Sequence, residues 1–419
     1  MSVTPSRVAV IGAGIGGLAT ALSLHAAGLE VDVYESVREI SPLGVGINLL
    51  PHAVRELDAL GLLSRLLDQS VSPNWLVYCT RRGQEIWREK RGLAAGYRWP
   101  QLSIHRGALQ LVLQEALVER MGPHSLHLGH RLLRVDRRGV RPVAVFENGR
   151  VEADALVAAD GIHSTVRRQL YPNEGGPVWN GALMWRGLAT IGAVLDGRTL
   201  IWAGHPDQKF VGYPIADLPD GRQLFNFVAE IRRPDSELAR GEDWNRAGSL
   251  DDFLPNFEAW NFGWLDVPSI IRSAPQTYLF PMVDRDPLPC WTFGRITLVG
   301  DAAHPMYPIG SNGASQAILD GRVLAGCIRR HPDDLEQAFE RYETVRRPAT
   351  ASIIEANRGL GPELPMKIVE ERAPGGFEDI NAVISPEEIE RLTEVYRQTA
   401  GFAVEALESG TSLIDLPYQ

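Results

Sequence analysis

Apolar and polar positions follow two different periods along this chain. Short β-branched runs, typical of buried strands, cover residues 7–11, 30–34, 155–159 and 295–299. Apolar residues at helical spacing predict helices over residues 18–27, 53–67 and 107–121, near residue 313, and over 334–350 and 385–408. Strands that alternate with helices predict an α/β fold with a parallel sheet. The largely strand-like residues 175–289 predict a second, β-rich module.

A glycine-rich turn follows the first strand. Gly12, Gly14 and Gly17 form a GxGxxG motif, and Glu35 ends the second strand. Gly12 permits a tight turn, Gly14 lets backbone approach a pyrophosphate, and Gly17 allows close packing of helix on strand. An acid about 20 residues on binds a ribose hydroxyl. The sequence therefore predicts a Rossmann-like dinucleotide site, and Glu35 favours an unphosphorylated ribose, as in FAD or NAD.

Two further strands end in an acidic residue. Asp160-Gly161 follows residues 155–159, and Gly300-Asp301 follows residues 295–299. A Pro/Gly-rich loop then leads into the helix at Gly313, whose free N–H groups can face a ligand. Acids at the carboxyl ends of strands lie where open sheets bind ligands. Arg106 precedes another helix, where it is either a phosphate contact or a solvated surface arginine.

Three other features carry weaker predictions. The small residues 42–48 form either a loop beside a ring system or a plain surface turn. Arg167, taken alone, is interpreted as a surface charge. The ten tryptophans are expected outside the nucleotide core, mostly packing between sheets and partly lining an apolar pocket for an aromatic ligand. The two C-terminal helices are expected to form a scaffold or a dimer surface.

Composition narrows the functional class only modestly. The 419 residues allow two or three domains, and the net charge of −10 argues against a nucleic-acid partner. Three cysteines without a CxxC pair fit a reducing cytoplasm and argue against disulfides or a zinc site, so no metal is expected. Glycines interrupt the apolar N-terminus, which argues against a signal peptide, and no apolar run is long enough for a membrane helix.

The three motifs, taken in order, resemble those of the single-component FAD-dependent aromatic hydroxylases, also called group A flavoprotein monooxygenases. The resemblance runs from about residue 7 to about residue 350 and is strongest to the phenazine-carboxylate hydroxylases, followed by the 3-hydroxybenzoate and salicylate hydroxylases. It implies an FAD-binding domain in three segments, a discontinuous β-sheet substrate domain and a C-terminal helical region. The expected segments are 1–74, 101–174 and 286–362 for FAD, 75–100 and 175–285 for the substrate, and 363–419 for the helices.

The resemblance also implies a role for each motif residue. Pyrophosphate contacts would come from Gly12, Gly14 and Gly17, the adenosine ribose contact from Glu35, and pyrophosphate and ribityl contacts from Arg106. FAD binding and NAD(P)H passage would involve Asp160 and Gly161, and a ribityl hydroxyl would bind Asp301. The flavin face where O2 adds would be flanked by Pro308 and Gly310, with Ser311 beside them, and the pyrimidine edge would meet Asn312 and Gly313.

The implied activity is aromatic hydroxylation. NAD(P)H would reduce FAD, and O2 would form a flavin C4a-hydroperoxide that hydroxylates an aromatic or fused heteroaromatic molecule carrying a carboxylate or phenol. The alternatives are a flavin oxidoreductase that inserts no oxygen and a flavin-binding regulator without turnover. Besides Pro308 and Gly310, the catalytic candidates are Arg186 and Tyr213. His205, Lys209 and Tyr307 are further candidates for a base, and His304 is expected to be structural. Arg186, Lys209 and Arg222 are candidates for a carboxylate partner, although arginines on sheets are usually solvated.

Overall fold

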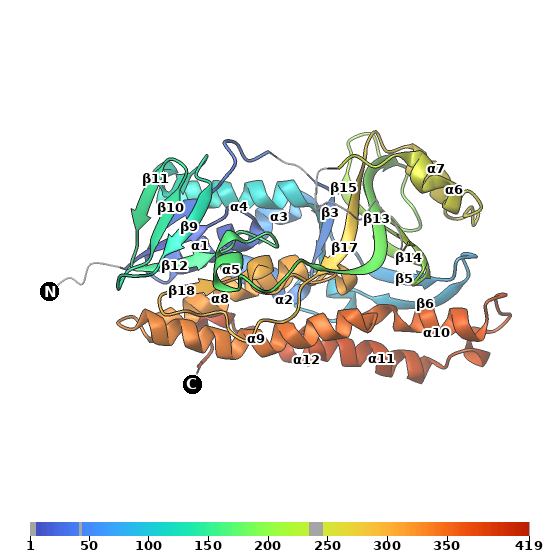
Figure 1. Cartoon of the computed structure of the whole chain (residues 1–419). Helices are drawn as coiled ribbons and strands as arrows, with labels where there is room; N and C mark the ends of the chain where they lie inside the picture. The colour runs from blue at the N-terminus through green and yellow to red at the C-terminus, as the bar shows by residue number, and fades with distance from the viewer. Residues whose placement is uncertain (1–5, 42–43, 234–245, 419) are drawn as a thin grey trace.

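The computed structural model describes residues 6–41, 44–233 and 246–418. A five-stranded parallel sheet forms the centre of the first module, shown with its covering helices in Figure 1. Its strands, in spatial order, are β18 (Ile296–Leu298), β12 (Ala155–Ala158), β1 (Arg7–Ile11), β2 (Glu30–Tyr34) and β8 (Leu126–His127). The sheet packs with α1 (Ile15–Ala26), α4 (Arg106–Met121), α5 (Thr165–Leu170) and α8 (Gly313–Arg330). The predicted α/β class is confirmed.

The second module is a seven-stranded sheet at the other end of the molecule (Figure 1). Its spatial order is β17 (Thr277–Asp284), β13 (Val178–Ile191), β16 (Gln223–Arg232), β15 (Gln208–Asp217), β14 (Thr199–His205), β5 (Trp75–Cys79) and β6 (Glu85–Lys90). The outer face packs on α6 (Leu254–Phe257) and α7 (Val267–Arg272). The inner face turns toward the first module and the C-terminal helices.

Two small antiparallel sheets complete the strands. One is a meander of β9 (Leu132–Asp136), β10 (Val143–Phe146) and β11 (Gly149–Glu152). The other contains β3 (Gly46–Leu49), β7 (Leu102–His105) and β4 (Ser70–Val71). The expected loop over residues 42–48 is therefore partly a strand, and its residues 42 and 43 lie outside the described residues.

Four helices of the C-terminal part of the chain run along one side of both modules (Figure 1). They are α9 (Leu335–Arg358), α10 (Leu364–Arg372), α11 (Pro386–Thr399) and α12 (Val404–Leu407). The single helix predicted over residues 385–408 is wrong, because Gly401 takes a left-handed φ of 74° between α11 and α12. Gly61, with φ 71°, likewise divides the helix predicted over 53–67 into α2 (Pro51–Ala59) and α3 (Leu63–Leu67). Across the described residues, no helix combines the length and apolar character needed to cross a membrane.

The tryptophan prediction is partly wrong. Trp291 is 1% exposed and belongs to the core of the first module, where its ring lies near those of His304 and Tyr342. Trp185, Trp202 and Trp260 are buried in the second module as expected. Trp244 lies outside the described residues.

Candidate active site

The glycine turn between β1 and α1 is shaped by two close approaches. A Cβ added at Gly17 would lie 2.0 Å from the Gly12 carbonyl oxygen, and one added at Gly12 would lie 2.4 Å from that of Ala159. Gly12 also has a left-handed φ of 104°. A Cβ at Gly14, in contrast, would meet nothing within 4 Å, and no side chain caps α1 there. The N-terminus of α1 therefore has open space at Gly14 and no side chain capping its first N–H groups.

Glu35 is tied directly to this turn. Its carboxylate accepts hydrogen bonds from the backbone N–H of Ala13 at 2.8 Å and of Val37 at 3.0 Å. The side chain remains partly exposed beside the turn. A carboxylate held in this way is suited to binding the hydroxyl groups of a ribose.

The second acidic strand end lies beside the glycine turn. Asp160 Oδ2 accepts hydrogen bonds from the N–H groups of Thr165 at 2.8 Å and Val166 at 3.3 Å, at the start of α5. Burial raises the pKa of Asp160 despite these bonds. Its Oδ1 atom is buried and has no hydrogen-bond partner in the part of the chain that the structure describes. Gly161 follows with φ 77°, and a Cβ there would meet nothing within 4 Å.

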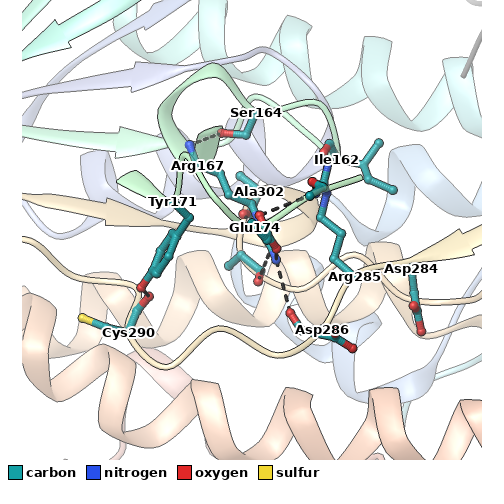
Figure 2. Close-up of polar contacts among 12 residues, drawn as sticks. Ile162, Ser164, Arg167, Tyr171, Glu174, Asp284, Arg285, Asp286, Cys290 and Ala302 are labelled. Atoms are coloured by element: carbon teal, nitrogen blue, oxygen red, sulfur yellow. Dashed lines mark hydrogen bonds and ion pairs between the residues drawn. The ribbon is translucent and has the colours of Figure 1, made fainter. Parts of the chain in front are cut away.

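Arg167 joins this segment to the third motif (Figure 2). Its guanidinium donates to the carbonyl oxygens of Ala302 at 3.1 Å, Ala303 at 2.9 Å and Asp286 at 3.2 Å, and it forms an ion pair with Glu174. Arg167 is 1% exposed, so its interpretation as a surface charge is wrong. Arginine has five donors in a rigid fork, and burial requires that they be used.

Arg285 reinforces the same cluster from β17's end (Figure 2). It donates from Nε to the Ile162 carbonyl at 3.2 Å and lies 3.5 Å from the Glu174 carboxylate. The sequence offered no signal for this cluster beyond the charges themselves, because it joins residues 162–174 to residues 285–303, more than a hundred residues further along the chain.

The third motif brings Asp301 and Arg106 into one region. Although solvent reaches the Asp301 side chain, the atoms packed around it desolvate the carboxyl and raise its pKa, while the Arg106 charge partly lowers it. Arg106 is exposed at the first turn of α4, where its backbone N–H donates to the Val45 carbonyl at 3.0 Å, and among the described residues its guanidinium has no hydrogen-bond or ion-pair partner. Gly16 and Gly300 both pack against Ala317 of α8, which joins the first motif to the third.

The loop before α8 has two consecutive left-handed residues. Gly310 has φ 70° and Ser311 has φ 59°. Pro308 is exposed, whereas Asn312 is buried, and no side chain caps the first turn of α8 at Gly313. A left-handed conformation at a non-glycine residue costs about 1 kcal/mol or more and persists where the surroundings enforce it. The loop therefore holds a particular shape and offers free helix N–H groups.

The inner face of the large sheet meets β3 at one residue, Gly46. Its carbonyl oxygen accepts from Arg186 Nη2 at 2.8 Å and from the Tyr213 hydroxyl at 2.9 Å, and its N–H donates to Asn226 at 2.7 Å. Arg186 also lies 5.8 Å from the ring centre of Phe280. Burial raises the pKa of Tyr213 and lowers that of Arg186, so the phenol stays protonated at neutral pH. Both predicted residues thus lie on the face that turns toward the first module.

The other candidates for base or carboxylate partner are engaged or remote. Lys209 is buried between Glu363 at 2.5 Å and Glu230 at 3.1 Å, and the two carboxylates raise its pKa although burial opposes this. Arg222 is exposed and pairs with Asp220 at a turn. Lys209 and Arg222 are therefore unsuited to holding a substrate carboxylate.

His304 and Tyr307 pack behind the loop before α8. His304 pairs with Asp320 at 2.5 Å inside the core, as expected of a structural residue. Tyr307 is buried in an apolar cluster, and burial raises its pKa to about 12. His205 ends β14 half-buried, and burial lowers its pKa.

The comparisons with known proteins agree with this geometry. The chain matches the FAD binding domain family over residues 5–181. It is 45% identical over 369 residues to phenazine 1,6-dicarboxylic acid hydroxylase of Lysobacter antibioticus, covering 85% of this chain and 90% of that protein. The chain belongs to the FAD-dependent aromatic hydroxylases. This hydroxylase uses FAD with NAD(P)H as co-substrate, as the family resemblance implied, and nothing in these relatives favours the two alternative functions.

Two further relatives and one solved structure extend this result. The 3-amino-4-hydroxybenzoate 2-monooxygenase of Streptomyces platensis is 34% identical, covering 85% of this chain and 88% of that protein. The 6-hydroxynicotinate 3-monooxygenase of Pseudomonas fluorescens is 31% identical, covering 83% and 88%. The crystal structure of HpxO from Klebsiella pneumoniae with FAD and uric acid shares the fold, with a TM-score of 0.75, 23% identity and coverage of 96% and 97%.

The residues present fit FAD. Uncapped N-termini of α1 and α8 are suited to anionic groups, because their N–H groups and helix dipoles are free. The buried, unpartnered Oδ1 of Asp160 and the exposed carboxylate of Asp301 are acceptors for hydroxyl or N–H groups. The open space at Gly14 leaves room for a pyrophosphate.

Proposed function

We propose that this hydroxylase oxygenates a planar, fused heteroaromatic carboxylic acid of the phenazine-carboxylate class. The observation that carries this proposal is an apolar cluster between the large sheet and the loop before α8. Its buried members are Ala182, Met184, Met282, Tyr307 and Ile309, and Phe280 and Val228 pack against it partly exposed. The partly exposed Phe280 and Val228 give this cluster an apolar edge that suits a flat, apolar ring system. The phenazine substrate of the Lysobacter relative supports the same class.

Arg186 is proposed to orient the substrate carboxylate. Arg186 lies on the inner face of the sheet beside Phe280. Among the described residues, its guanidinium donates to the Gly46 backbone carbonyl and not to a carboxylate. A guanidinium forms strong, directional hydrogen bonds to a carboxylate. Tyr213 keeps its proton and is proposed as a hydrogen-bond donor in the site, not as a base.

The FAD contacts are proposed as follows. The N–H groups around Gly12, Gly14 and Gly17 would hold the pyrophosphate with Arg106, and Glu35 would bind the ribose. Asp160, Gly161 and Asp301 would face the ribityl side, and Pro308, Gly310, Ser311, Asn312 and Gly313 the flavin ring. When bound, FAD supplies the reduction of O2 and the transfer of one oxygen atom. The apolar cluster would exclude water from that reaction.

We also propose a cellular location and an oligomeric state. The described cysteines are free thiols, which supports a reducing cytoplasmic location. The charged surface of α11 is proposed as a homodimer face, which sedimentation of the purified protein would test.

A substrate panel tests the proposed function. Phenazine carboxylate, its neutral carboxamide and a single-ring hydroxybenzoate are each incubated with NADH or NADPH under isotopically labelled O2. We expect the phenazine acid to gain one labelled oxygen atom at the highest kcat/KM. Arg186→Met should raise KM for the acid by about tenfold or more, as loss of a charged hydrogen bond predicts, and leave KM for the carboxamide unchanged. Equal KM changes for acid and amide would contradict the carboxylate role.

A further inference from the structure

The C-terminal helix α11 places one polar side chain beneath the loop before α8. Tyr396 is 4% exposed, and a Cβ added at Gly310 would lie 2.0 Å from its hydroxyl oxygen. A Cβ at Gly361 would lie 2.8 Å from the same ring. Both glycines therefore leave the space that this phenol occupies. Nothing in the sequence pattern around residue 396 signalled such a role, because a tyrosine on an amphipathic helix is normally a core residue.

The Tyr396 hydroxyl links two buried asparagines. It accepts from Asn312 Nδ2 at 2.7 Å and donates to Asn357 Oδ1 at 2.8 Å. Asn357 Nδ2 in turn donates to the Tyr307 carbonyl at 3.2 Å, and Asn312 Nδ2 also donates to the Gly310 carbonyl at 3.2 Å. The hydroxyl thus uses its single proton and one lone pair, and it ties both ends of the loop to α11 and α9.

The same chain of donors continues into α8 and α9. Gln316 Nε2 donates to Asn312 Oδ1 at 3.4 Å, and Arg346 Nη2 donates to Gln316 Oε1 at 2.6 Å. Arg346 is itself held by Asp320 at 2.8 Å. Every amide orientation is consistent along this chain, from the buried ion pair to the Tyr307 carbonyl. Fully satisfied buried networks of this kind impose one conformation.

We infer that Tyr396 is a positioning residue for the flavin ring, acting through the turn at Gly310 and Ser311. Its hydroxyl keeps that turn left-handed, so that the backbone N–H groups at the start of α8, which no side chain caps, keep their positions. These donors and the α8 dipole favour negative charge in front of them, and reduced flavin is anionic near its pyrimidine ring. The inference rests on the proposed FAD site and goes beyond it, because it assigns a function to the C-terminal region.

The test compares two tyrosine variants from the same apolar cluster. Tyr396→Phe removes the hydroxyl and leaves Asn312 and Asn357 without their partner. Tyr97→Phe is the matched control, because Tyr97 is also buried there and donates to the Phe402 carbonyl at 2.6 Å, away from the loop. Each purified variant is measured for its melting temperature, its FAD dissociation constant and the two-electron reduction potential of the bound flavin.

We expect both variants to melt at lower temperatures than the wild type by similar amounts. Only Tyr396→Phe should bind FAD about tenfold more weakly and lose about tenfold in its preference for reduced over oxidised flavin, which is a shift of about 30 mV to more negative potential. Wild-type potential and FAD affinity in Tyr396→Phe would overturn the inference, as would equal changes in Tyr97→Phe. The proposed FAD site is tested separately by Asp301→Ala. Full FAD occupancy in that variant would show that the site is assigned wrongly, whatever the result for Tyr396→Phe.

Discussion

The two ends of the proposed FAD site are built in different ways. The nucleotide end is local: Gly12, Gly14 and Gly17 form one turn, and Glu35 reaches back to Ala13 of that turn. The ring end is assembled from distant segments, as the contacts of Gly46 with Asn226 and of Asn312 with Tyr396 show. The nucleotide end depends mainly on glycines, which have no side chain. The ring end depends on buried side chains that each need a specific hydrogen-bond partner. Mutations should therefore separate folding from cofactor binding at the first end more cleanly than at the second.

Breaking the link between the second and third motifs should have the largest effect. Arg167→Met removes a buried guanidinium that serves three carbonyl oxygens and leaves Glu174 without its main cation. Loss of one member of a buried ion pair costs about 3–5 kcal/mol. We expect a corresponding fall in unfolding free energy in urea and loss of bound FAD. The adjacent exposed Arg168→Met is the control, and equal stability of the two variants would contradict this account.

A pair of glycine variants tests the local end. Gly17→Ala places a Cβ against the Gly12 carbonyl, which should cost about 1–3 kcal/mol or more of stability and also reduce FAD binding. Gly14→Ala points its Cβ into open space, so the apoprotein should unfold like the wild type while FAD affinity falls about tenfold. Fluorescence titration with FAD and urea unfolding measure the two effects. Equal FAD affinity of Gly14→Ala and wild type would place the pyrophosphate elsewhere.

Substitution of Asp301 should affect FAD binding without lowering the stability of the protein. The atoms packed around this solvent-exposed carboxyl desolvate it and raise its pKa, so the charged form costs free energy in the folded protein at neutral pH. Asp301→Ala should therefore leave the apoprotein at least as stable as the wild type, yet purify with much less FAD. The ratio of flavin to protein absorbance reports occupancy. An unchanged ratio would remove Asp301 from the cofactor site.

The polar network behind the ring end should respond to pH. Burial, with the charges of Arg55 and Arg346, lowers the pKa of His52 to about 3 from 6.5. The unfolded chain therefore binds a proton between these values that the folded protein does not, and stability falls as pH drops below 6.5. The slope is at most about 1.4 kcal/mol per pH unit. His52→Gln should lose this part of the pH dependence, and parallel stability curves for the two proteins would refute it.

The same contrast explains what the sequence could predict. Strand bounds at β1 and β2, the glycine turn and the three acidic strand ends follow from local patterns, and the structure places them in one region. Arg167 was misinterpreted because the three carbonyl oxygens that bind it are more than a hundred residues away in sequence, and its charge alone resembles that of a surface residue. Tyr396 was missed because its partners Asn312 and Asn357 lie on other elements, 84 and 39 residues away. Lys209 was predicted as a possible partner of a substrate carboxylate. The structure shows that it pairs instead with Glu230 and Glu363, both buried.

The most direct measurement is a crystal structure with FAD bound. The account predicts that the pyrophosphate lies at the turn around Gly14 and that the pyrimidine edge of the flavin meets the N–H groups of Asn312 and Gly313. One flavin face should then look toward Arg186 and Phe280. A flavin ring distant from residues 308–313, or a loop whose own side chains fill that space, would contradict it.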